Sequence, residues 1–431
     1  MPEKWILEQY RHLPLIAKVH MSQARIREWY DHWQGQVCVS FSGGKDSTVL
    51  AHLVHEYYPD VPLVFANTGL EYPEIQVFAR KMGAEFVRPK MNFSEVISTY
   101  GYPIISKENA EAIYYARRIR NSVGGVQGNS QKASGHATAN AWKSTVPEYS
   151  GGGTSDLTAR RDLLLGGIGR LNEKAPGYKE DEANGKTDWR EWRRSSIAGV
   201  GDFSEEQKSI FNKEKWLPLC RDTQFKISHM CCSVMKKGPM KIYQRKHKVY
   251  PYIGTLTEES KLREQAWIRH GCNAFEGSHK TSQPISFWTE QDILKYLYVE
   301  GWEIAEVYGD IVGVDKDGME YEPIPGVDCQ LKCTGCNRTG CIFCGFGAHL
   351  EKGETRFQRL ARTHPKQYEY CMGGGQWVDN PEYDPTAPEK DGEWVNWNPK
   401  KIWVPSKEGL GMKKVFDDCN QIYGKDFYRY D

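Results

Sequence analysis

Hydrophobic and polar positions in the first part of the chain follow a pattern of short buried strands and longer helices. The segment 14–33 has helical spacing, with Ile16, Val19, Ile26 and Trp29 on one face. Beyond it, short apolar runs alternate with helical stretches, which predicts strands at 36–41, 62–66 and 85–87 and helices at 46–58 and 73–82. This alternation predicts an α/β fold with a doubly wound, parallel sheet.

The same alternation resumes in the second half, with a strand expected at 248–256 and helices at 258–270 and 290–299. The stretch 121–212 is rich in Gly, Ser, Asn, Lys and Arg and predicts a polar insertion, not a second core. We therefore expect an α/β domain built from 1–120 and 213–300. A cysteine-rich region would occupy 301–431, and we expect irregular structure in its tail beyond Gly373.

Composition narrows the class of protein. Hydrophobic residues make up 39% and charged residues 26%, which favours a packed core over disorder. The net charge of +1 provides no overall basic field, so a nucleic-acid partner would need a local patch. The first thirty residues do not resemble a secretory signal, and no apolar run approaches the length that spans a membrane. We expect a cytoplasmic protein without a membrane partner.

Cysteines are the most informative residue type, with 12 in the chain. In a reducing cytosol, clustered cysteines indicate metal or redox sites more often than disulfides. Seven fall in two groups: the pair Cys231-Cys232 and a run of Cys329, Cys333, Cys336, Cys341 and Cys344. The others are scattered, and we interpret most of them as small buried hydrophobes.

A glycine turn between the first predicted strand and the next helix has the chemistry of a phosphate site. It reads Ser42-Gly43-Gly44-Lys45-Asp46-Ser47. Glycines permit positive φ and close backbone approach, and the first N–H groups of the helix then face an anion. Lys45 supplies a point charge for phosphate, while Asp46 could hold Mg²⁺ or cap the helix. A Walker loop is excluded because its upstream glycine is missing and Asp46 follows Lys45.

This loop resembles the PP-loop of the adenine-nucleotide α-hydrolase superfamily, which includes N-type ATP pyrophosphatases and phosphoadenylyl-sulfate (PAPS) reductases. The resemblance implies a Rossmann-like nucleotide-binding domain at 1–120 and 213–300, with ATP, or PAPS or adenylyl sulfate (APS), as its ligand. The implied nucleotide-binding residues are Ser40, Ser42, Gly43, Gly44, Lys45, Asp46, Ser47, Thr48, Asn67, Thr68 and Gly69. In the segment from Asn67 to Glu74, Asn67 stands where the family more often has Asp.

Further segments resemble the PAPS and APS reductases in the same order along the chain. Cys231-Cys232 precedes Lys236-Lys237 and a proline, Glu259-Ser260-Lys-Leu-Arg263 matches a Glu-Ser-x-x-Arg element, and Trp288-Thr289 matches a later one. The resemblance implies that the substrate anion is held by Lys236, Lys237, Glu259, Ser260 and Arg263.

In reductases that carry an iron–sulfur cluster, a Cys-Cys pair and a later Cys-x-x-Cys hold one [4Fe–4S] cluster. By this resemblance the ligands here are Cys231, Cys232, Cys341 and Cys344. The alternative is a Zn²⁺ site made by Cys333, Cys336, Cys341 and Cys344, whose paired spacing suits four-thiolate coordination. Cys329 could belong to either arrangement.

Two departures from the reductases bear on the reaction. Lys45 is present, as in enzymes that split ATP between its α and β phosphates, and the carboxy-terminal Glu-Cys-Gly-Leu/Ile-His motif is absent. Both favour an ATP pyrophosphatase with sulfurtransferase activity, similar to enzymes of DNA phosphorothioation and tRNA thiolation, with Lys45, Asp46 and Arg263 as catalytic residues. The alternatives are a PAPS or APS reductase that releases sulfite, and a nucleotide-sensing subunit without turnover.

Such an enzyme needs a sulfur donor, for example a cysteine desulfurase, or a thioredoxin-like reductant. A nucleic-acid acceptor would suit the arginines at 117–120, 160–161 and 193–194, although a solvated loop surface is the alternative interpretation of these pairs. A homo-oligomer is also compatible with the sequence.

Overall fold

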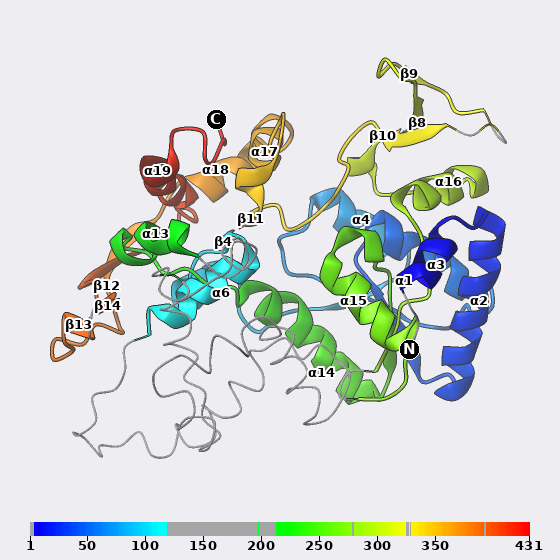
Figure 1. Ribbon diagram of the computed structural model, residues 1–431, viewed down its shortest axis with the longest axis horizontal. Helices are drawn as coiled ribbons and strands as arrows, with labels where there is room; N and C mark the ends of the chain where they lie inside the picture. Colours follow the sequence, from blue (N-terminus) through cyan, green and yellow to red (C-terminus); the bar gives the residue numbers. More distant parts are fainter. Residues whose placement is uncertain are drawn as a thin grey trace. The chain divides into compact units, whose positions relative to one another are not determined.

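The computed structural model describes residues 4–118, 197, 213–277, 280–324, 327, 329–391 and 394–431 (Figure 1). The expected insertion at 121–212, with its arginine pairs at 160–161 and 193–194, lies outside the described residues apart from Ile197. The chain divides into two compact units. Unit 1 comprises the described parts of 4–90 and 234–341, and unit 2 those of 91–118, 213–233 and 342–431.

Unit 1 is built on a six-stranded sheet in the order β3-β2-β1-β5-β7-β6. Its strands are β1 (Val37–Phe41), β2 (Leu63–Ala66), β3 (Glu85–Val87), β5 (Tyr250–Ile253), β6 (Asn273–Ala274) and β7 (Thr281–Ser282). Every neighbouring pair is parallel except β6 with β7. The prediction of a mainly parallel α/β sheet is therefore confirmed, and β1 lies inside the sheet with β2 and β5 on its two sides.

Helices cover both faces of this sheet. Cys38 and Val64 point to one face, where they pack with Met240 and Tyr243 of α14 (Gly238–His247). Neighbouring positions on a strand point to opposite faces. On the other face, the Tyr252 hydroxyl donates a hydrogen bond of 2.7 Å to a carbonyl of α2 (Leu15–His32), which packs with α3 (Lys45–His55).

The remaining elements of unit 1 include the helices predicted at 73–82, 258–270 and 290–299, with shifted ends, and others that the sequence did not predict. They are α1 (Lys4–Arg11), α4 (Pro73–Lys81), η3 (Thr257–Glu259), α15 (Lys261–His270), α16 (Glu290–Glu300), η4 (Glu306–Tyr308), β8 (Ile311–Val314), β9 (Glu320–Tyr321) and β10 (Gln330–Cys333). The helix expected at 258–270 is interrupted at Ser260. The extended backbone of this residue lets its side chain accept a hydrogen bond from the Leu262 N–H and cap α15.

Unit 2 contains more regular structure than the sequence suggested. It holds α5 (Phe93–Tyr100), β4 (Ile104–Ile105), α6 (Lys107–Ala116), η1 (Glu214–Trp216), α13 (Leu217–Asp222), β11 (Gly345–Phe346), η5 (Ala348–Leu350), α17 (Arg356–Thr363) and α18 (Pro365–Met372). The π-helical turn η2 (Ser233–Lys237) leads from unit 2 into α14.

The tail beyond Gly373 corrects our expectation of irregular structure. It forms β12 (Gln376–Asp379), β13 (Lys390–Asp391), β14 (Trp394–Val395), β15 (Lys401–Val404) and α19 (Met412–Tyr423). In α19, Val415, Phe416 and Cys419 are fully buried at helical spacing. The sequence analysis missed this helix because most of the tail is rich in Trp, Pro and Gly. The helix covers only the last part of the tail.

Arg117 also differs from expectation. The arginines at 117–120 were expected either to contact phosphates or to lie on a solvated loop surface. The Arg117 guanidinium is buried and donates to the carbonyls of Leu219, Cys220 and Phe225 and to the Thr223 hydroxyl, at 2.6–2.9 Å. It also lies over the ring of Trp397, 4.3 Å from its centroid. Burial lowers the pKa of Arg117 to about 10. Arg117 therefore joins separate segments of unit 2 through its guanidinium.

Within the part of the chain that the structure describes, none of the helices combines the length and the apolar character needed to cross a membrane.

Candidate functional site

The glycine turn after β1 is shaped by close packing. Gly43 has a φ of +70°, and a Cβ built there would lie 2.7 Å from Ile75 Cγ2 of α4. Any other residue would be strained and would also clash. Gly44 then serves as the N-cap of α3, so the first N–H groups of that helix open onto the turn. Sequence and packing together produce the glycine turn and the helix start on which the prediction of a phosphate site rests.

Hydroxyl groups hold the loop in this shape. Ser47 and Thr48 both donate to the Gly44 carbonyl, at 2.9 and 3.0 Å, and Ser47 Oγ accepts from the Ser42 backbone N–H. Ser42 Oγ accepts from the Gly44 N–H at 3.3 Å, and the side chain of Ser42 is exposed. Ser47 and Thr48 therefore shape the loop, while Ser42 also presents a hydroxyl at its surface.

Lys45 is buried at the start of α3, with 7% of its side chain exposed. Its ammonium donates to Glu290 Oε1 at 3.0 Å and lies 5.5 Å from the centroid of the Tyr308 ring. A Cβ built at Gly44 would lie 3.4 Å from the Tyr308 hydroxyl, so this tyrosine stands close to the turn itself. Glu290 and Tyr308 thus surround the lysine that we predicted to bind phosphate.

Asp46 carries a carboxylate in a partly buried and charged environment. Burial raises the pKa of Asp46 above its ordinary value, and the charges of Lys45, Arg338 and Arg263 oppose this shift. All three cations therefore act on the same carboxylate. The phosphate loop and the Glu-Ser-x-x-Arg element consequently lie near each other, as the resemblance implied.

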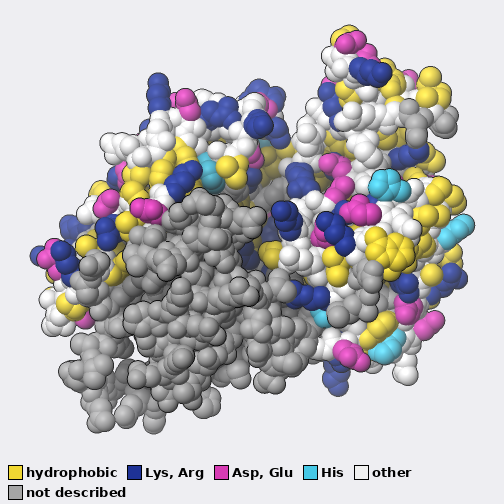
Figure 2. All heavy atoms as spheres, viewed as in Figure 1, with side chains coloured by type: hydrophobic (Ala, Val, Ile, Leu, Met, Phe, Trp, Pro, Cys, Tyr) yellow, Lys and Arg dark blue, Asp and Glu magenta, His cyan; other side chains and the backbone are white. Residues whose placement is uncertain are grey.

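Glu259 joins two arginines in front of this loop. Its carboxylate forms ion pairs with Arg263, four residues later, and with Arg338, at 2.6 Å from the latter. Arg338 belongs to the segment that carries the cysteine run, and 64% of its side chain is exposed. Basic and acidic side chains are interspersed around α15 on the visible face of unit 1 (Figure 2). The anion site predicted from Glu259 and Arg263 thus gains a second guanidinium.

The loop after β2 is organised by a buried carboxylate. Glu71 accepts from the backbone N–H and the hydroxyl of Thr68, at 3.1 and 2.7 Å, and Asn67 Oδ1 accepts from the Gly69 N–H. Lys236 of η2 lies 3.5 Å from Glu71. Because Glu71 is 7% exposed and polar groups surround it, it fixes both this loop and one of the two predicted lysines.

Three other predicted residues have more local surroundings. Ser40 lies within β1, paired in register with Val64 and Ile253, on the face of the sheet covered by α14. The side chain of Ser260 caps α15. Lys237 ends the π-helical turn η2, a type of distortion that frequently marks functional sites.

Part of the cysteine run lies beside the phosphate loop. Cys333 ends β10, and its buried thiol has a raised pKa, a shift that the nearby charge of Lys45 opposes. Cys336 is also buried, with its sulfur 3.9 Å from the Tyr72 hydroxyl oxygen. The first Cys-x-x-Cys pair therefore adjoins the candidate nucleotide site.

The four cysteines predicted as cluster ligands differ in exposure. Cys231 is buried, whereas Cys232, Cys341 and Cys344 are partly exposed. Thiols are suitable donors for either iron–sulfur or zinc chemistry. However, among the described residues no three His, Cys, Asp or Glu side chains are grouped as a metal ion would require. The geometry therefore does not place a metal, and both ligand sets stay predictions from the motifs.

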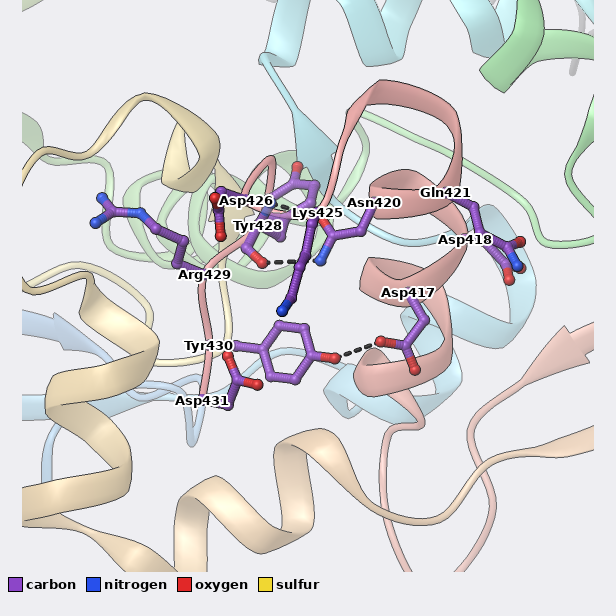
Figure 3. A pocket seen from close by; sticks show the side chains of 10 residues that line it. All are labelled: Asp417, Asp418, Asn420, Gln421, Lys425, Asp426, Tyr428, Arg429, Tyr430 and Asp431. Atoms are coloured by element: carbon purple, nitrogen blue, oxygen red, sulfur yellow. Dashed lines mark hydrogen bonds between the residues drawn. The ribbon is translucent and has the colours of Figure 1, made fainter.

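A concave region lies in unit 2, at the end of the chain. It has a volume of about 450 Å³ and is lined by residues of α19 and the segment that follows it (Figure 3). Tyr430 points its hydroxyl at Asp417, and Asn420 exchanges hydrogen bonds with the backbone of Tyr428. Four aspartates line this region. They outnumber the two basic residues of the lining, Lys425 and Arg429, and therefore disfavour a nucleotide phosphate there.

Sequence reasoning missed three neighbours of the phosphate loop: Glu290, Tyr308 and Arg338. Glu290 directly follows the Trp288-Thr289 match, so its position was a usable signal. Arg338 lies inside the cysteine run, and its charge was overlooked because that segment was interpreted only as a source of metal ligands. Tyr308 has no recognisable motif around it.

Comparison with known proteins agrees with this geometry. The model of the phosphoadenosine phosphosulfate reductase domain matches residues 36–113 and 203–345, just over half of the chain. The chain belongs to the phosphoadenosine phosphosulfate reductase family. This PAPS reductase family binds adenine nucleotides and acts in sulfur metabolism, and its members are enzymes. The matched ranges contain the glycine turn, the Cys231-Cys232 pair and the Glu259–Arg263 element.

One relative is a sulfate adenylyltransferase subunit 2 from Shewanella sediminis (strain HAW-EB3). It is 31% identical to this chain over 90 residues, which cover 18% of this chain and 29% of the relative. The match therefore spans less than a third of that protein, and supports the family more than any one reaction.

Proposed function

We propose that this PAPS-reductase-family chain is an ATP-dependent sulfurtransferase: it cleaves ATP to AMP and pyrophosphate to activate an acceptor for sulfur. The observation that carries the proposal is the position of Lys45. A buried ammonium at the start of α3, beside an open glycine turn, is suited to the negative charge of a leaving pyrophosphate. The guanidiniums near Asp46 add further positive charge at the same place.

The reaction proceeds in two displacements. A carbonyl or phosphate oxygen of the acceptor attacks the α-phosphorus of ATP, the α–β bridging bond breaks, and pyrophosphate leaves with the electron pair. Sulfide then displaces AMP from the activated acceptor. With a persulfide donor, such as the product of a cysteine desulfurase, a further thiol or a thioredoxin-like reductant must cleave the resulting disulfide.

The residues of this chain have separate roles in these steps. The α3 N–H groups and Ser42 position the phosphates, Lys45 neutralises the leaving group, and Arg263 holds the anion. Asp46 is the residue that would hold Mg²⁺, which supplies additional charge neutralisation at the phosphates. A [4Fe–4S] cluster at Cys231, Cys232, Cys341 and Cys344, or Zn²⁺ at the alternative set, belongs to the proposal on the cysteine motifs alone. No step here depends on it.

If the acceptor is a nucleic acid, the proposed reaction is similar to DNA phosphorothioation. A net charge of +1 means that such an acceptor must be held locally.

The competing function is reduction of PAPS or APS with release of sulfite. The specific observation in its favour is the family itself, together with the Cys231-Cys232 pair inside the matched range. In that reaction a thiol attacks the sulfate sulfur and the nucleotide leaves, so neither pyrophosphate nor AMP from ATP would form.

One experiment separates the two functions. Anaerobically purified protein is incubated with ATP or with PAPS, together with Mg²⁺, DNA as the acceptor, sulfide and dithiothreitol, and pyrophosphate, AMP and sulfite are measured along with iron and zinc content. Pyrophosphate and AMP from ATP, in equal amounts, are expected. Sulfite from PAPS without pyrophosphate from ATP would replace the proposal by the reductase. Nucleotide binding without any product would favour a sensing subunit.

A further inference from the structure

Arg338 occupies a position that the family motifs do not explain. It lies between Cys336 and Cys341 in the sequence and reaches Glu259 of η3, 79 residues earlier. The hydroxyl of the next residue, Thr339, lies 2.6 Å from the Tyr308 hydroxyl, which stands beside Gly44 of the phosphate loop, and the charge of Arg338 opposes the raised pKa of Asp46. Arg338 is therefore close to the phosphate loop although it belongs to the cysteine run.

The turn that carries Arg338 is fixed at both ends. Before it, the N–H groups of Gly335 and Cys336 donate to the carbonyls of Tyr308 and Val307, at 2.8 and 2.9 Å. After it, the Thr339 hydroxyl lies 2.6 Å from the Tyr308 hydroxyl. A Cβ at Gly335 would lie 2.5 Å from the Val307 carbonyl oxygen, so the turn packs directly on η4. Arg338 is thus presented from a held backbone, and its long side chain alone needs to move.

Two guanidiniums share one carboxylate here, and the three cations Lys45, Arg263 and Arg338 together face the carboxylates of Glu259, Glu290 and Asp46. Arg263 and Arg338 share the single carboxylate of Glu259, while Lys45 is paired with Glu290. An incoming anion can take Arg338 from Glu259, because Glu259 keeps Arg263 as its partner. The exposure of Arg338, 64% of its side chain against 16% for Glu259, makes it the more accessible member of the pair.

We propose that Arg338 is a binding residue for the β- and γ-phosphates of the nucleotide, and that it selects a nucleoside triphosphate over a monophosphate. The inference rests on the proposed function, because it assumes that the glycine turn holds a nucleotide. With Lys45 and Arg263, Arg338 makes three cations for the extended charge of a polyphosphate. A guanidinium binds two phosphate oxygens at once, which suits this role.

The test compares affinities of the full-length, anaerobically purified protein for α,β-methylene-ATP and for AMP, by titration calorimetry. The non-cleavable analogue keeps binding separate from turnover. For Arg338→Gln we expect affinity for the analogue to fall about tenfold, with less than about a twofold change for AMP. Arg338→Lys keeps the charge but cannot bind two phosphate oxygens at once, so its affinity for the analogue should lie between those of the unaltered protein and Arg338→Gln.

Arg25→Gln is the matched control, because Arg25 also forms an ion pair with one glutamate, Glu28, at 3.0 Å on the surface of α2. It should bind both nucleotides as the unaltered protein does. Equal losses for the analogue and AMP in Arg338→Gln, or no loss for either, would overturn the role of Arg338 while leaving the proposed function intact. Failure of the unaltered protein to bind the analogue would overturn both.

Discussion

At the scale of single residues, the site depends on charges whose partners are already in place. Lys45 contacts Glu290 and the Tyr308 ring, and three cations interact electrostatically with the Asp46 carboxylate. A nucleotide phosphate therefore enters as a competitor for existing partners. Such an arrangement keeps the side chains positioned before the ligand arrives, which lowers the cost of ordering them on binding.

Lys45 provides the direct test at this scale. Lys45→Ala should lower the rate of pyrophosphate release by at least about 100-fold, because it removes the charge that stabilises the leaving group. Stability should fall by about 1 kcal/mol or less, since Glu290 is 44% exposed on its side chain and can be hydrated instead. Pyrophosphate assay and urea unfolding measure the two effects.

Lys81→Ala is the control for that substitution, since Lys81 forms an exposed ion pair with Glu303. It should change neither activity nor stability appreciably. Full activity in Lys45→Ala would remove the central claim about the phosphate loop.

At the scale of elements, one buried ion pair joins the two helices that frame this loop. Lys18 of α2 is 2% exposed and donates to Asp292 Oδ2 of α16 at 2.6 Å. The same carboxylate oxygen accepts from the N–H and hydroxyl of Thr289, closing the capping box of α16. Because Glu290 begins α16, this pair indirectly places the partner of Lys45.

Lys18→Met should therefore be costly. It leaves the partly buried Asp292 carboxylate without its cation, and we expect a loss of about 2 kcal/mol in the free energy of unfolding. Urea denaturation monitored by tryptophan fluorescence measures this loss. Arg25→Met, which breaks an exposed pair on the same helix, should cost no more than about 0.5 kcal/mol. Similar losses in both variants would show that burial of Lys18 is energetically unimportant.

At the scale of the whole molecule, each unit holds a histidine that burial keeps neutral. In unit 1, His52 stacks on Trp302 with ring centroids 3.7 Å apart, and burial together with His55 lowers its pKa from 6.5 to about 4. In unit 2, His349 stacks on Phe427, and burial together with Lys215 lowers its pKa to about 4 as well. The native state therefore binds fewer protons than the unfolded state at mildly acidic pH.

Acid should consequently destabilise both units. For a depressed histidine pKa, the stabilising contribution is complete above the unfolded value of 6.5 and is lost as the pH falls toward about 4. We expect the free energy of unfolding to fall by about 1–2 kcal/mol per histidine over this window. His52→Phe and His349→Phe should each flatten the pH dependence. Unfolding curves of the three proteins at several pH values test this, and parallel curves would count against it.

Metal content is also a property of the whole chain. Cys341→Ser or Cys344→Ser should remove the metal under either ligand set, because both sets contain these residues. Cys231→Ser and Cys333→Ser distinguish the sets. Loss of iron and colour in Cys231→Ser but not in Cys333→Ser is expected for the cluster, and the opposite pattern with zinc for the alternative. Metal analysis and visible spectra of anaerobic protein measure both, and full metal content in Cys341→Ser would exclude both sets.

The sequence by itself determined the features that depend on neighbouring residues. Short apolar runs predicted the strands β1, β2, β3 and β5 within three residues at each end but missed the two-residue strands β6 and β7. The glycine turn with its helix followed from Gly43 and Gly44. Family membership was also contained in these local motifs. The helix α19 was missed because a short apolar spacing was outweighed by the composition around it.

Only the tertiary structure decided which side chains meet. Glu290 reaches Lys45 across 245 residues and Arg338 reaches Glu259 across 79, and no local pattern encodes such separations. Arg117 likewise looks like a surface cation in sequence, yet packing buries it among four acceptors. Local geometry is set by neighbouring residues, whereas the charges of a site are set by how distant elements pack. The sequence could therefore locate the loop, and the fold supplied its partners.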